Sequence, residues 1–225
     1  MKIWYASGRQ KDRSSQNLMI QAKFWADDAK HMDVVRWMYQ QRFGNSMSVK
    51  GKSLEMLRGE EGQRMKDIYQ KYADKYGIEW QGRRYDVKNF DSQDKIQKLI
   101  TEGNQLLYNV CHAAILSLGF SPTLGFIHTG KMLSFVYDLA DLYKTDIVIP
   151  TAFENCNICS NDDFSNFRKA LRSRMLDNIL LKQITKDLYD MFYLREKGSD
   201  KDDDLMIWDN TRNQKAGYNF SNMGR

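Results

Sequence analysis

Apolar side chains recur three or four positions apart through most of this chain, which is the spacing that places them on one face of a helix. The first such stretch predicts a helix from Ser14 or Ser15, either of which can cap it, to about Arg42. The only prolines are Pro122 and Pro150, so long helices can run uninterrupted. Five further helices are expected over residues 53–77, 92–119, 133–143, 162–178 and 179–197.

The remaining segments lack helical spacing. Residues 2–7 predict a short strand, 9–17 a polar turn and 146–153 an extended connector. Residues 198–225 are polar, carry an acidic run and predict a mobile tail, in which Ile207–Trp208 could dock on the folded part. The expected fold class is therefore mostly α.

Composition narrows the class of protein. The 225 residues are 42% hydrophobic, which fits a folded chain, and 34 Lys and Arg against 29 Asp and Glu leave a net charge of +5. This small excess permits a polyanionic partner without requiring one. No signal peptide is recognisable and no apolar run reaches the ~18 residues needed to cross a bilayer, so a cytoplasmic protein without a membrane partner is expected.

The cysteines give little indication of a metal site or of redox activity. Three cysteines agree with a reducing compartment. Cys156 and Cys159 form a CxxC pair, but the second pair or the nearby histidines of a zinc site are missing.

Glu61 occupies an apolar position of its predicted helix. It falls in register with Leu57 and Met65, where a carboxylate is rarely buried without a partner or a metal ion. The alternative is a charge at the edge of the apolar face, paired with Arg58 or Arg64.

A second unusual segment, residues 125–131, reads Gly-Phe-Ile-His-Thr-Gly-Lys before a predicted helix. A ligand can closely approach His128, which lies between glycines, whereas the alternative is a loop histidine that caps the helix. Lys131 and the neighbouring backbone N–H groups could hold a phosphate. The segment is not a P-loop, because no Ser or Thr follows Lys131.

Asp138 and Asp141 lie three positions apart and so share one helix face. Such carboxylates repel each other unless a cation lies between them, and the alternative is a solvated acidic face. Together with Glu61 and His128 they form a carboxylate-rich set with one imidazole, which suits Mg²⁺ or Mn²⁺ better than structural Zn²⁺. An ion of this kind can activate a hydroxyl and stabilise charge on a phosphodiester.

Three segments resemble signatures of the CRISPR-associated adaptation integrases. Residues 57–62 (Leu-Arg-Gly-Glu-Glu-Gly) are similar to the family's RGxEG helix motif, and residues 119–141 are similar to its second signature. Residues 80–86 (Trp-Gln-Gly-Arg-Arg-Tyr-Asp) resemble a third block, best known from the type I-E branch. The similarity extends from about Lys2 to Glu154.

The resemblance implies a reaction and a set of site residues. Members of this family insert spacers into the CRISPR array: a 3′-hydroxyl of a short DNA duplex attacks a phosphodiester at the repeat boundary, promoted by a divalent ion. By this resemblance Glu61, His128 and Asp141 are metal ligands and catalytic residues, with Asp138 as a further catalytic acid. The DNA-binding residues that it implies are Arg64, Arg83, Arg84, Tyr85, Tyr108, Lys131 and Tyr137, of which Tyr108 could instead be a core residue.

The resemblance also implies a domain organisation. Residues 1–10 would retain one strand of the family's N-terminal β domain, 11–197 would form the helical catalytic domain, and 198–225 the polar tail. The chain is then either a naturally compact integrase or a truncated one. Its expected partners are double-stranded DNA, as prespacer and CRISPR repeat, and further copies of itself in a dimer or tetramer. Compact members act without the family's usual small partner protein, so that protein could be absent here.

Two other functions remain open from the sequence. The same site could let water attack in place of a 3′-hydroxyl, which would make the protein a metal-dependent nuclease. Alternatively, the chain could hold DNA as a scaffold without joining or cutting it.

Overall fold

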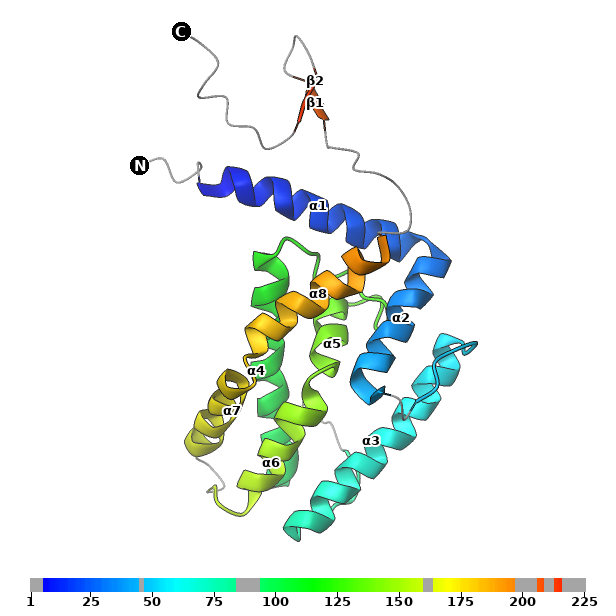
Figure 1. Ribbon diagram of the computed structural model, residues 1–225. Helices are drawn as coiled ribbons and strands as arrows, with labels where there is room; N and C mark the ends of the chain where they lie inside the picture. Colours follow the sequence, from blue (N-terminus) through cyan, green and yellow to red (C-terminus); the bar gives the residue numbers. More distant parts are fainter. Residues whose placement is uncertain are drawn as a thin grey trace.

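The computed structural model confirms a mostly helical fold (Figure 1). The structure describes residues 6–44, 47–83, 94–159, 164–196, 206–208 and 213–215. In chain order the helices are α1 (Ala6–Ala26), α2 (Asp28–Phe43), α3 (Leu54–Tyr76), α4 (Lys95–Ser117), α5 (Ser134–Asp141), the π-helix η4 (Lys144–Val148), α6 (Ile149–Cys156), α7 (Ser165–Asp177) and α8 (Leu180–Glu196).

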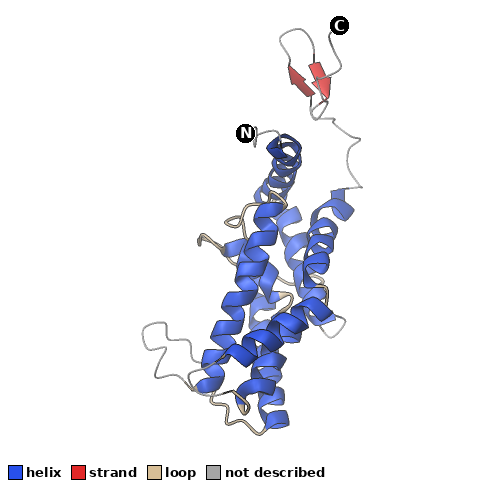
Figure 2. Cartoon of the chain, turned by 90° about the vertical axis from the view of Figure 1, so that its left-hand side faces the viewer, coloured by secondary structure: helices blue, strands red, loops and turns tan. Residues whose placement is uncertain are grey.

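Helix α4 is the central element of the bundle. It packs against α5, η4, α6, α7 and α8, while α3 packs against α6 on the other side (Figures 1 and 2). The face that α4 turns inward includes Leu99, Ile100 and Leu107, which are fully buried. Helices α1 and α2 pack against each other, and both contact α8. This arrangement brings α2, α3 and α5 around one site.

The long helix expected from Ser14 or Ser15 to Arg42 is in fact two helices. The chain breaks at Asp27, whose extended backbone leaves the helical conformation and whose carboxylate accepts hydrogen bonds from Ala29 N and Lys30 N, both at 3.0 Å. Aspartate is a favoured N-cap because it satisfies backbone donors that a helix start leaves unpaired. The break lets α2 turn away from α1 toward α3.

The extended connector expected over residues 146–153 is wrong. This stretch is helical, as part of η4 followed by α6, and Ile147, Val148 and Ile149 are buried. Its β-branched residues favour strand locally, but their burial against α4 and α7 outweighs that preference. Pro150 lies in the first turn of α6, where a missing N–H costs nothing.

Both ends of the chain also depart from expectation. The backbone is helical from Ala6, so the part of the expected strand over residues 6–7 and the polar turn over 9–17 are wrong, as is a remnant strand over 6–10. Residues 1–5 lie outside the described part. Within the predicted tail, β1 (Met206–Trp208) pairs antiparallel with β2 (Asn213–Lys215), and Met206 lies opposite Lys215.

The helix termini predicted around α3 are confirmed. Ser53 caps its start by accepting a hydrogen bond from Met56 N, and Gly77 ends it in the left-handed conformation with φ 63°. None of the helices in the described part is long and apolar enough to cross a membrane.

Candidate active site

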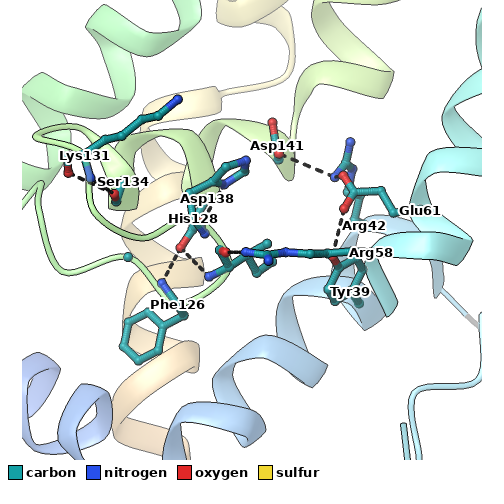
Figure 3. Close-up of polar contacts among 12 residues, drawn as sticks. Tyr39, Arg42, Arg58, Glu61, Phe126, His128, Lys131, Ser134, Asp138 and Asp141 are labelled. Atoms are coloured by element: carbon teal, nitrogen blue, oxygen red, sulfur yellow. Dashed lines mark hydrogen bonds and ion pairs between the residues drawn. The ribbon is translucent and has the colours of Figure 1, made fainter. Parts of the chain in front are cut away.

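The loop before α5 is anchored by one fully buried carboxylate. Asp138 Oδ2 accepts hydrogen bonds from the backbone N–H groups of Phe126 (2.5 Å) and Ile127 (3.0 Å), and Oδ1 accepts from that of His128 (2.8 Å) (Figure 3). The same Oδ1 lies 2.7 Å from His128 Nδ1. With four donors around it, Asp138 positions the loop and is not exposed for a ligand. The backbone N–H groups of residues 126–128 are likewise engaged, so they cannot form the predicted phosphate site.

The carbonyl groups of the same loop are held from the other side. Trp25 Nε1 donates to Gly125 O at 3.1 Å, His31 Nε2 lies 2.8 Å from Phe126 O, and Arg58 donates to Ile127 O. These three side chains come from α1, α2 and α3. The loop is therefore held on one side by α5, which follows it directly, and on the other by α1, α2 and α3, which lie far from it in the sequence.

Gly125 is required by this close packing. A Cβ atom there would lie 2.2 Å from His128 O and 2.7 Å from Ser134 C, both backbone atoms. Any side chain would push the loop away from the start of α5.

His128 is oriented by Asp138. Since Nδ1 faces the carboxylate, it carries a proton, and Nε2 points away from Asp138 and forms no hydrogen bond with the described residues. The hydrogen bond to Asp138 raises the pKa of His128 despite partial burial, and Asp141 raises it further. The ring of Tyr137 packs edge-on against the imidazole at 5.9 Å between centroids.

Glu61 is held by two residues of α2. Tyr39 donates its hydroxyl hydrogen to Glu61 Oε2 at 2.8 Å, and Arg42 Nη1 pairs with Oε1 (Figure 3). Burial, and then the charge of Glu61, raise the pKa of the Tyr39 phenol. The predicted alternative partners, Arg58 and Arg64, are not those that pair with Glu61: Arg58 bonds the loop, and Arg64 lies over the ring of Phe43.

Asp141 lies between two cations. Lys144 Nζ is 2.5 Å from its Oδ1, and Arg42 Nη1 is 3.6 Å from its Oδ2. Burial would raise the pKa of Asp141, but Lys144 and Arg42 together hold it below the usual value. Because Asp138 and Asp141 are both buried, the alternative of a solvated acidic face is wrong.

The three predicted metal ligands converge without forming a ready-made cluster. Glu61 and Asp141 share the cation Arg42, and the charge of Asp141 acts on His128, yet no group of three His, Cys, Asp or Glu side chains in the described ranges is close enough to hold an ion. Their chemistry nevertheless fits a hard divalent cation. Asp141 Oδ1 is buried and its partner in the described residues is the ammonium of Lys144, so this oxygen is an anionic donor of the kind that such a cation prefers. A histidine whose other ring nitrogen bonds a carboxylate is the usual form of a metal-binding histidine.

Comparison with known proteins identifies the family. The family model for CRISPR associated protein Cas1 matches residues 9–189 of the chain. The chain belongs to the Cas1 family. The assignment made from the three sequence motifs is thereby confirmed.

Individual relatives agree with this assignment. A CRISPR-associated endonuclease Cas1 from Thermus thermophilus is 41% identical over 212 residues, which cover 94% of this chain and 64% of that protein. A Cas1 endonuclease from Clostridium sp. is 37% identical over 221 residues, covering 97% and 73%. Among solved structures, a complex of TtCas1 with DNA matches with a TM-score of 0.73 and 42% identity, covering 81% of this chain and 68% of that one. The chain thus spans less than two thirds of the length of the Thermus relative.

The predicted DNA-binding residues fall into different surroundings in this Cas1-family chain. Lys131 is exposed beside the active-site loop, and Tyr137 lies between His128 and Tyr108. Tyr108 is half-buried with Lys144 Nζ 4.8 Å from its ring centre.

Two of the predicted arginines lie away from the loop. Arg83 donates to Gln97 Oε1 (2.5 Å) and Thr101 Oγ1 (2.8 Å), so its guanidinium fastens the chain to α4. Arg64 faces Phe43. Arg84 and Tyr85 lie outside the described residues.

Five site residues were missed in the sequence, the first being Trp25 of α1, which donates to Gly125 O. Tyr39, Arg42 and His31 lie on α2, whose pattern carries no sign of the residues they meet in α3 and in the loop. Lys144 could have been found, since it follows Asp141 by three positions and such pairs meet on a helix surface.

Proposed function

We propose that this Cas1-family chain is a metal-dependent DNA integrase that inserts short duplex DNA at CRISPR repeats. The observation that carries the proposal is the orientation of His128 by Asp138, which engages Nδ1 and leaves Nε2 facing away from Asp138, together with Asp141 and Glu61 brought to one cation. A histidine and two carboxylates from three separate segments match the ligand preferences of Mg²⁺ and Mn²⁺. Glu61, His128 and Asp141 would hold the ion.

In the proposed reaction, the 3′-hydroxyl oxygen of the incoming duplex bonds to the phosphorus at the repeat boundary, and the bond from that phosphorus to the 3′-oxygen of the neighbouring nucleotide breaks. One phosphodiester replaces another, so no external energy source is needed. When bound, a divalent ion would favour deprotonation of the attacking hydroxyl and stabilise charge on the phosphate.

The chain's own residues would support this step by positioning. Asp138 fixes the tautomer and orientation of His128, and Tyr39 fixes the carboxylate of Glu61. The exposed Lys131 would pair with a backbone phosphate beside the loop. DNA as the substrate is supported by the similar TtCas1, whose structure was solved with DNA.

Assembly and location belong to the same proposal. We expect two or more copies to act together, because insertion of a duplex with two ends requires two active sites. The three cysteines are buried as free thiols, in keeping with a reducing cytoplasm.

Endonuclease activity is the second candidate. It is favoured by the names of the relatives from Thermus thermophilus and Clostridium sp., both described as endonucleases. The same side chains would serve, with water in place of the 3′-hydroxyl, and the products would be nicks without joined strands.

A strand-transfer assay tests the proposal. A labelled short duplex with free 3′-hydroxyls is mixed with the protein, a supercoiled plasmid carrying a CRISPR repeat, and Mn²⁺. The wild type should join label to the plasmid, and Glu61→Gln and His128→Ala should lower the rate by about 100-fold or more, the loss typical for a group that acts on the transition state.

Glu60→Gln is the matched control. Glu60 neighbours Glu61 on α3 but pairs with Lys52 at 2.5 Å, away from Arg42. It should join DNA at the wild-type rate. If Glu61→Gln kept that rate, the proposal would be wrong. Nicking without joining would identify a nuclease, and DNA binding without any product would identify a scaffold.

A further inference from the structure

Arg42 is a buried cation that connects carboxylates of two other helices. It lies in the last turn of α2, and its side chain is 5% exposed. Its Nη1 pairs with Glu61 Oε1 of α3 and lies 3.6 Å from Asp141 Oδ2 of α5. One guanidinium thus stands between the two carboxylates that the proposed function assigns to the metal.

The rest of the guanidinium is poorly satisfied for a buried arginine. Arg42 Nη2 contacts Met65 Sδ at 3.1 Å, the group lies over the ring of Phe43 at 5.0 Å, and Nε is buried without a hydrogen-bond partner. Leaving a buried donor unpaired is unfavourable, so hydrogen bonding alone does not account for Arg42. Its charge does, because two carboxylates that lose water repel each other unless a cation compensates them.

Asp141 has a second cation on its other oxygen. Lys144 Nζ lies 2.5 Å from Oδ1, and its side chain is 15% exposed. The negative charges of Glu61 and Asp141 are therefore balanced by two cationic side chains of the protein, Arg42 and Lys144. A divalent ion placed among them would be attracted by Glu61 and Asp141 and repelled by Arg42 and Lys144.

We infer that Arg42 is a built-in counter-cation that holds Glu61 and Asp141 together before metal binds. When a divalent ion binds, Arg42 loses its contacts with these two carboxylates. Arg42 is then a positioning residue with two opposite effects. It stabilises the metal-free protein, and by doing so it weakens metal binding, since any interaction that favours the unbound state lowers the apparent affinity. The inference rests on the proposed function, because it assumes that Glu61 and Asp141 bind the ion.

The deciding variant is Arg42→Gln, which removes the positive charge and leaves a planar, uncharged amide at the end of the side chain. Without metal, in EDTA, its melting temperature should fall by about 5 °C or more, because Glu61 and Asp141 lose their shared counter-charge. Its Kd for Mn²⁺, measured by titration calorimetry on the full chain without DNA, should fall at least about tenfold, because a unit charge close to a divalent ion has been removed. Added Mn²⁺ should therefore raise its melting temperature more than it raises that of the wild type.

Two further variants separate charge from structure. Arg42→Lys keeps the positive charge and should bind Mn²⁺ with a Kd within about threefold of the wild type, because the repulsion is retained. Arg36→Gln removes an arginine of the same helix that pairs with Asp33 at 3.3 Å, and its Kd for Mn²⁺ should equal that of the wild type. A merely structural role for Arg42 would instead make both Arg42 variants bind Mn²⁺ more weakly.

Lys144→Gln keeps the inference testable if Arg42→Gln fails to fold. It removes the other cation from Asp141 and should also tighten Mn²⁺ binding. Unchanged or weaker Mn²⁺ binding in the charge-removing variants that fold, Arg42→Gln or Lys144→Gln, overturns the inference, even if the wild type binds Mn²⁺ and Glu61→Gln abolishes that binding. If neither the wild type nor the cation variants bind Mn²⁺, both the inference and the metal dependence of the proposed function are wrong.

Discussion

Two aspartates of α5, Asp138 and Asp141, organise this site, the first through hydrogen bonds and the second through ion pairs. Asp138 is fully buried and accepts three backbone N–H groups as well as the hydrogen of His128 Nδ1. Asp141, one turn later on α5, is paired with Lys144 and Arg42 instead. Two acids of identical chemistry thus acquire different roles, one as an anchor of the loop and the other as a proposed ligand, because their surroundings differ.

At this scale, His128 should make stability depend on pH. Its pKa is raised above 6.5 in the folded protein by the hydrogen bond to Asp138, so folding favours the protonated form. The contribution of the charged His128 to the free energy of unfolding should be complete below about pH 6.5, the unfolded pKa, and should be lost as pH rises through the folded pKa.

Urea denaturation of the wild type and His128→Ala between about pH 5 and 9 checks this, alongside an NMR titration of the imidazole. The difference in unfolding free energy between the two proteins should shrink as pH rises. A difference that grows with pH, or a His128 pKa below its ordinary value, would contradict the account.

At the scale of elements, the two ends of α3 were predictable, whereas the break at Asp27 and the helical backbone of residues 146–153 were not. Ser53 and Gly77 mark α3 by local rules, whereas the π-helix and α6 form because α4 and α7 cover their β-branched residues. Helix α4 packs closely on η4 and α7 at Gly103. A Cβ there would lie 2.7 Å from Val148 Cγ1 and 3.0 Å from Phe167 Cζ.

Gly103→Ala should therefore destabilise the protein even though alanine favours helix. Overpacking of a core costs about 1–3 kcal/mol, and the helical preference of alanine offsets about 0.5–1 kcal/mol of it. The expected net loss is about 1 kcal/mol, within a range of about 0–2.5 kcal/mol, in the free energy of unfolding measured with urea.

Gly59→Ala in α3 is its control, because no atom lies within 4 Å of the new Cβ. It should raise the free energy of unfolding by about 0.5–1 kcal/mol. Equal gains for both variants would show that α4 does not pack tightly on η4 and α7.

At the scale of the whole molecule, an aromatic cluster joins the first helix, α1, and the last helix, α8, to the loop of the candidate site. Phe192 of α8 lies 5.6 Å from the ring of Phe24 in α1, 5.9 Å from that of Phe126 in the loop and 6.2 Å from that of Phe135 in α5. The loop that carries His128 therefore packs on a cluster to which both α1 and α8 contribute.

Phe192→Ala should cost about 3–5 kcal/mol of unfolding free energy, the range for removing a fully buried phenylalanine. Tyr189→Ala is the comparison on the same helix, since Tyr189 is 49% exposed, and it should cost about 1 kcal/mol or less. Chemical denaturation measures both. Similar small losses would mean that the cluster does not support the fold.

The sequence by itself determined the helical class, the ends of α3 and the family. Hydrophobic periodicity, capping residues and motifs each depend only on residues that are close together in the chain. The sequence also indicated Glu61, His128, Asp138 and Asp141 as unusual residues. Tertiary structure alone placed Arg42 between Glu61 and Asp141 and made Asp138 the anchor of the loop. The reason is physical: the partners come from helices that meet only when the chain is packed, and burial and charge at that meeting are properties of the fold and not of any one segment.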